Sequence, residues 1–116
     1  MADESRGGEP IEVDDETFPE RVLKARGFVL VDCWAPWCSG CRKTTPVMRA
    51  LARDHAGRLT VAELDTQANR YTCGKLALEG IPSFLLYRDG TELERIVGAA
   101  DREKFEEVLR RHGVLD

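Results

Sequence analysis

The chain has 116 residues, of which 42% are hydrophobic and 33% charged, with a formal net charge of -4 and a sequence pI near 5.3. This length suits one domain with a modest core, and the acidic balance argues against non-specific binding to nucleic acids. No apolar run approaches the ~18 residues of a membrane span. The first ten residues lack the basic and apolar regions of a secretory signal, so we expect a cytoplasmic protein.

The N-terminal part of the sequence predicts a lead-in, a short strand and a helix. Residues 1–10 are polar and acidic and are expected to be a disordered lead-in to a domain over residues 11–116. Residues 11–13 are predicted to form an edge strand. The acidic run 14–16 then supplies a cap and favourable first-turn charge for a helix over about 17–25. The expected apolar stripe of this helix is Phe18, Val22 and Leu23.

A buried strand followed by a helix is predicted at the centre of the sequence. Residues 28–34 are apolar except for Asp32, which is typical of a strand buried on both faces. The helix is expected to begin at about Ser39 and to end near His55. Pro46 lies inside it and cannot donate to the preceding turn, so we expect a kink there.

The second half of the sequence predicts three more strands and two more helices. Asp89 and Gly90 form a strong hairpin signal that joins the last two strands. The complete order is β-α-β-α-β-α-β-β-α, which indicates an α/β domain with a parallel and an antiparallel part in one sheet. The predicted elements are strands over 59–64, 84–87 and 93–97, a short helix within 67–78, and a final helix that Asp101 caps and Gly113 closes.

The connection between the central strand and helix carries two cysteines, Cys38 and Cys41, separated by Ser39 and Gly40. A cysteine at a helix N-terminus is stabilised as a thiolate by free N–H groups and by the positive end of the dipole. Cys41, one turn further on, is close enough to attack a mixed disulfide formed at Cys38. The pattern therefore favours a dithiol/disulfide switch.

The alternative interpretation of the two cysteines is half of a structural zinc site. Zinc requires four ligands, often as two spaced pairs. The remaining candidates, Cys33, Cys73, His55 and His112, are isolated in the sequence, which favours redox chemistry. Cys33 lies in the buried strand and is expected to pack as a small hydrophobe. Cys73 is either an incidental thiol or part of a regulatory or intermolecular disulfide.

The sequence resembles the thioredoxin family from about Val13 to Gly113. The resemblance implies a thioredoxin fold, with a central mixed β-sheet flanked by helices, and dithiol–disulfide exchange on protein substrates. The combination of Cys38 and Cys41 with the tryptophan before them, Asp32 and Ile81-Pro82 is highly specific to the family. The matching positions are Val29 to Asp32, Trp34, Ala35, Trp37, Cys38, Cys41, Pro46, Leu59 to Ala62, Gly80 to Pro82, Asp89, Gly90 and Val97 to Ala99.

The resemblance also implies residue roles. Cys38 attacks a substrate disulfide, Cys41 releases the product, and Asp32 corresponds to the buried carboxylate that exchanges protons with the resolving thiol. Pro82 corresponds to a cis-proline beside the disulfide, and Trp37 covers one side of the substrate surface. The apolar lip of that surface corresponds to Ile81, Gly98 and Ala99.

The resemblance further implies that the protein needs no bound cofactor of its own, and we expect it to be a monomer. Its dithiol would be restored by a flavin-containing thioredoxin reductase that uses NADPH. No metal, nucleic-acid or membrane partner is expected, and the partners would be this reductase and proteins that contain disulfides.

Two departures from the family pattern carry expectations of their own. Ser39-Gly40 stands where the family most often has Gly-Pro, so we expect a less reducing protein. Glu63 stands where the family usually has lysine, so we expect Asp32 to hold its proton to higher pH. These departures leave open a more oxidising or partner-specific redox protein. A binding or chaperone module that uses the same groove without turnover is also left open. Trp34 is expected to belong to the core.

Overall fold

The computed structural model describes residues 8–115, so most of the expected lead-in over residues 1–10 lies outside it. The order of strands and helices predicted from the sequence is confirmed. The elements are β1 (Ile11–Val13), a π-helix (Pro19–Leu23), β2 (Phe28–Trp34), α1 (Ser39–Asp54), β3 (Leu59–Asp65), α2 (Arg70–Leu76), β4 (Ser83–Arg88), β5 (Thr91–Val97) and α3 (Arg102–Arg111).

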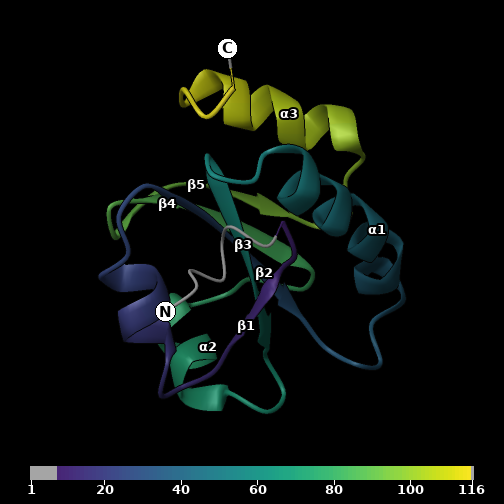
Figure 1. Cartoon of the computed structure of the whole chain (residues 1–116). Helices are drawn as coiled ribbons and strands as arrows, with labels where there is room; N and C mark the ends of the chain where they lie inside the picture. The colour runs from purple at the N-terminus through teal and green to yellow at the C-terminus, as the bar shows by residue number, and fades with distance from the viewer. Residues whose placement is uncertain (1–7, 116) are drawn as a thin grey trace.

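The five strands form one mixed sheet in the order β1-β3-β2-β4-β5. The pairs of β1 with β3 and of β2 with β3 are parallel, whereas β4 is antiparallel to both β2 and β5. β2 is therefore a central strand, as its apolar sequence predicts. Helices cover both faces of the sheet, with α1 and α3 on one face and α2 and the π-helix on the other (Figure 1).

Alternating side chains of β2 pack into two separate cores. Leu30 points to the face where Met48 and Leu51 of α1 and Phe105 of α3 are buried. Val29, Val31 and Cys33 point to the opposite face, where Phe18, Val22 and Leu76 pack. Cys33 is fully buried in this second core, so the expected packing role is confirmed. Burial on both faces is what fixes the register of β2 against its neighbours.

The turn between β4 and β5 has the conformation that its sequence requires. Asp89 and Gly90 both have positive φ, at 48° and 83°, as in the hairpin turns that match strand twist. Arg88 pairs with Thr91 on either side of these two residues. A Cβ at Gly90 would overlap the backbone carbonyl of Leu23, so glycine is required both for conformation and for space.

The helix predicted over 17–25 is shorter than expected and is a π-helix, in which Lys24 N–H donates to the carbonyl of Pro19. The acidic residues before it act in two different places. Asp14 accepts from Thr17 N–H at 2.8 Å and closes the local turn. Asp15 accepts from Thr72 N–H at 2.9 Å, which lies in the first turn of α2. Leu23 was expected in the apolar stripe but is 45% exposed, because it is the last residue of the π-helix and lines an open groove with Phe18 and Tyr71.

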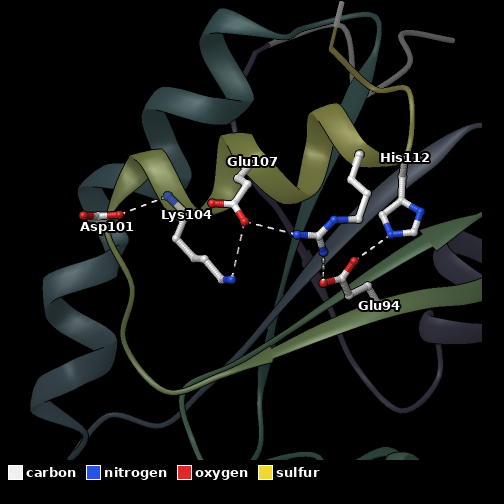
Figure 2. A network of polar contacts seen from close by, with 6 residues as sticks. Glu94, Asp101, Lys104, Glu107 and His112 are labelled. Atoms are coloured by element: carbon white, nitrogen blue, oxygen red, sulfur yellow. Dashed lines mark hydrogen bonds and ion pairs between the residues drawn. The ribbon is translucent and has the colours of Figure 1, made fainter.

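At the C-terminal end of α3, polar contacts join this helix to β5 (Figure 2). Glu94 of β5 accepts from Arg111 at 2.6 Å and lies 2.7 Å from the ring of His112. At the other end, Asp101 caps the helix as predicted, since its side chain accepts from Lys104 N–H at 3.0 Å.

Within residues 8–115, none of the helices has the length and apolar character needed to cross a membrane.

Candidate functional site

The two cysteines of the motif lie where β2 gives way to α1. Cys38 has extended backbone geometry and is the N-cap of α1, and its Sγ accepts from Cys41 N–H at 3.2 Å. The two residues form a disulfide with their Cα atoms 5.3 Å apart. The sulfur of Cys38 therefore occupies the position where the helix offers an unpaired N–H and its positive dipole end. This arrangement stabilises a thiolate on Cys38 once the disulfide is reduced.

The surroundings of the disulfide are apolar and confined. Cys38 is 7% exposed and Cys41 is 3% exposed, and both pack with Ala35, Trp34 and Ile81. Trp34 was expected in the core, but it is only partly buried and lies against the cysteine pair. Trp37, directly before Cys38, is 68% exposed. An exposed tryptophan beside a mostly covered sulfur is a surface feature suited to contact with another chain.

Four of the predicted substrate residues, Ile81, Pro82, Gly98 and Ala99, come together beside the cysteine pair and the first turn of α1. The Ile81-Pro82 peptide bond is cis. The carbonyl of Pro82 accepts from Gly98 N–H at 2.8 Å, which joins the loop before β4 to the end of β5. A Cβ added at Gly40 would lie 3.3 Å from Cδ of Pro82 and 3.7 Å from Cβ of Ala99. The first turn of α1 therefore meets this lip closely, and Gly40 leaves room for it.

Asp32 lies apart from this surface, inside the sheet. It is 2% exposed, and its Oδ1 has no hydrogen-bond partner among residues 8–115. Glu63 is its register partner on β3, so the two carboxylates project from the same face of the sheet. Burial, followed by the negative charge of Glu63, raises the pKa of Asp32 from 3.8 to about 7.

The two remaining cysteines are free thiols. Cys33 is buried on the face opposite to Asp32, and its burial raises the pKa of the thiol far above its ordinary value. Cys73, on α2, is partly exposed. Within the described part of the chain, no three His, Cys, Asp or Glu side chains are grouped so as to hold a metal ion.

Sequence reasoning missed two features of the site. It gave Gly40 a role only in backbone flexibility, whereas the structure shows a close approach to Pro82. It also passed over Thr44 and Thr45, whose hydroxyls both donate to the carbonyl of Cys41 at 3.0 Å. Two threonines in a helix that also contains a proline were the available signal, because threonine hydroxyls bond to carbonyls in the preceding turn.

Comparison with known proteins gives one consistent result. The family model described as thioredoxin matches residues 9–111. A thioredoxin of Pseudomonas aeruginosa is 40% identical over 94 residues, which is 81% of this chain and 87% of that protein. Thioredoxin 1 of Nostoc sp. is 32% identical over 87% of this chain and 94% of its own length. A thioredoxin of Staphylococcus haemolyticus is 34% identical over 88% of this chain and 96% of its own length.

Proposed function

Since the chain belongs to the thioredoxin family and is a protein-disulfide reductase, we propose that Cys38 and Cys41 carry out its dithiol–disulfide exchange in the roles of attacker and resolver. The observation that carries this assignment is the position of Cys38 as N-cap of α1, with Cys41 N–H directed at its sulfur. Only this sulfur gains both the hydrogen bond and the dipole, so it is the stronger candidate for the thiolate.

The reaction begins from the dithiol form. The Cys38 thiolate attacks one sulfur of a substrate disulfide, forms a mixed disulfide with it, and releases the other substrate sulfur as a thiolate that takes up a proton. Cys41 then loses its proton and attacks Sγ of Cys38, which forms the Cys38–Cys41 disulfide and releases the second substrate thiol. Two electrons pass from the protein to the substrate, and the product is the disulfide form seen here.

Asp32 is the proposed acceptor of the Cys41 proton. A thiol is a poor nucleophile until it is deprotonated, and Cys41 is too well covered for bulk water to act freely, at 3% exposed. Asp32 is a buried carboxyl on the face covered by α1, its Oδ1 has no hydrogen-bond partner among residues 8–115, and burial and Glu63 raise its pKa to about 7. A base whose pKa lies near the working pH is the most effective proton acceptor.

The proposed substrate surface lies between Trp37 on one side and the lip on the other. The lip consists of Ile81, Gly98 and Ala99, and Pro82 lies next to it. Cys38 lies between these two parts, and Pro82 has no N–H of its own to pair with a bound chain. We infer that an extended substrate segment lies across Cys38 and contacts the apolar lip, as the resemblance to the family implies.

The family's members pass electrons to disulfide-containing proteins and receive them from a reductase, without a bound cofactor of their own. For this chain we propose a flavin-containing thioredoxin reductase that draws electrons from NADPH. We further propose that the protein acts as a monomer in the cytoplasm.

A more oxidising or partner-specific variant of the same activity is the second candidate, and Gly40 is the observation that favours it. Closing the disulfide restricts the backbone of Ser39 and Gly40, and glycine loses more conformational freedom than other residues. The disulfide is therefore less favoured than it would be with a pre-organised turn, which makes the protein a weaker reductant.

The test is reduction of insulin disulfides, followed by turbidity, with dithiothreitol as electron donor. Wild type should accelerate precipitation, whereas Cys38→Ser should be inactive and Cys73→Ser, as the matched control, should match wild type. Equal activity of Cys38→Ser and wild type would overturn the assignment. Replacing dithiothreitol by NADPH and a thioredoxin reductase separates the two candidates, because a specialised oxidant is not expected to accept electrons from this donor.

A further inference from the structure

Three carboxylate residues lie side by side across the sheet. Glu12 of β1 is in register with Glu63 of β3, and Glu63 is in register with Asp32 of β2. Register partners on adjacent parallel strands project from the same face of the sheet, and such strands lie ~4.8 Å apart. The face is the one covered by α1, because Leu30 and Val61, two positions earlier on β2 and β3, pack in the core that contains Met48. The three carboxylates therefore form one row.

Burial increases steadily along this row. Glu12 is exposed at the edge of the sheet, Glu63 is partly buried, and Asp32 is 2% exposed. Negative charge at Glu63 consequently acts on Asp32 with little water between them, and a low local dielectric strengthens the repulsion. The next residue in the row beyond Asp32 is Phe84 of β4, which offers no charge to offset it.

Other charged groups act on the row through Glu63. Arg49 of α1 lowers the pKa of Glu63, whereas burial and the neighbouring Glu12 raise it, burial being the largest of the three effects. Cys33, the other titratable neighbour of Asp32, lies on the opposite face of β2 and carries a proton because burial raises its pKa. Glu63 is thus the charged residue directly beside Asp32, and Glu12 and Arg49 lie around Glu63.

We propose that Glu63, beside Asp32 in the row, is a positioning residue for the resolving step: its negative charge makes the Asp32 carboxylate a stronger proton acceptor for Cys41, and Glu12 and Arg49 adjust that charge. The inference rests on the proposed role of Asp32 as proton acceptor for Cys41. When Cys41 attacks Sγ of Cys38, its proton passes to an Asp32 carboxylate that Glu63 has made more basic. Without that charge Asp32 ionises at lower pH and is a weaker base for the thiol.

The experiment titrates the Asp32 carboxyl by carbon-13 NMR in wild type, Glu63→Gln and Glu63→Lys. Glu12→Gln is the matched control, because it removes the same charge one strand further away. For charges ~5–6 Å apart and an effective dielectric of 20–80, removal of Glu63 should lower the Asp32 midpoint by about 0.5 to 2 pH units. Glu63→Lys should lower it further, and Glu12→Gln should move it less than Glu63→Gln.

A kinetic measurement gives a second readout that a purely structural role would not move. The rate at which Cys41 resolves a preformed mixed disulfide on Cys38 should rise with pH along a curve displaced to lower pH in Glu63→Gln, by the same amount as the NMR midpoint. An Asp32 midpoint that is unchanged in both Glu63 variants would overturn the proposal. Insulin reduction by wild type and its loss in Cys38→Ser would still hold in that case, so the two failures are distinguishable.

Discussion

Replacement of Asp32 by asparagine should stabilise the protein, by an amount that depends on pH. The folded chain keeps a proton on this carboxyl up to about pH 7, because burial and Glu63 raise its pKa from the ordinary value of 3.8. The unfolded chain loses that proton near its ordinary value. Between these two values the folded state binds more protons than the unfolded state, so the free energy of unfolding of wild type falls as the pH rises.

The size of the effect follows from the same two values. Each factor of ten in a protonation equilibrium corresponds to ~1.4 kcal/mol. The interval from 3.8 to about 7 then gives a cost of about 4 kcal/mol, fully present above the higher value. Asp32→Asn has no carboxyl to ionise and avoids this cost. Its advantage over wild type should be near zero at about pH 3, roughly 1–2 kcal/mol at about pH 5, and about 4 kcal/mol at about pH 8.

The assay is urea unfolding of the disulfide form of wild type and Asp32→Asn across this pH range. Glu79→Gln, at an exposed carboxylate, is the control and should run parallel to wild type. A stability difference between Asp32→Asn and wild type that stays constant from acid to alkaline pH would refute the reasoning, because it would mean that Asp32 ionises alike in both states. Activity should fall in the same variant, since the proposed proton acceptor is lost.

Three further predictions concern other parts of the molecule. Replacing Ser39-Gly40 by Gly-Pro should lower the reduction potential by roughly 20–40 mV, since ~1.4 kcal/mol corresponds to about 30 mV for a two-electron couple; equilibration with glutathione measures it, and a higher potential would contradict it. Gly90→Ala should lower the free energy of unfolding by about 2 kcal/mol or more, because a Cβ there overlaps the carbonyl of Leu23 at positive φ; chemical denaturation that shows no loss would count against the turn geometry. Glu94→Gln should cost about 1 kcal/mol at neutral pH, because hydrogen bonds from the neighbouring histidine and arginine of α3 lower the pKa of Glu94. A carboxyl with a lowered pKa stabilises the fold above its ordinary value, so this cost should vanish as the pH falls through the lowered pKa, and thermal unfolding at acid and neutral pH checks it.

Local pattern predicted most of the fold. The apolar run of β2, the Asp89-Gly90 turn and the Asp101 cap each specify their structure through neighbouring residues, and each agrees with the structure. The π-helix did not follow from the sequence, because an apolar stripe with a leading acidic run is equally compatible with an ordinary helical turn. Asp15 illustrates the same limit: it accepts a hydrogen bond from the first turn of α2, more than fifty residues away, and only the tertiary structure brings the two together.

In the site, too, local spacing predicted some features, whereas others depend on the tertiary structure. The spacing of Cys38 and Cys41 predicts their pairing, since two residues of a first helical turn bring the sulfurs within reach. The close approach of Gly40 to Pro82 brings together segments that are distant in the sequence, and it depends on how α1 packs beside the loop before β4. The row of Glu12, Glu63 and Asp32 depends on the register of three strands, which the sequence alone leaves undetermined.

The central claim is that the sulfur at the start of α1 attacks first and its neighbour one turn later resolves. Trapping of the covalent intermediate tests this most directly. Cys41→Ser and Cys38→Ser, each in the reduced form, are mixed with a peptide that contains a single disulfide, and intact mass spectrometry follows the adduct. We expect a stable peptide adduct on Cys38 in the first variant and almost none in the second; rapid adduct formation on Cys41 in the second variant would reverse the two roles and contradict the account.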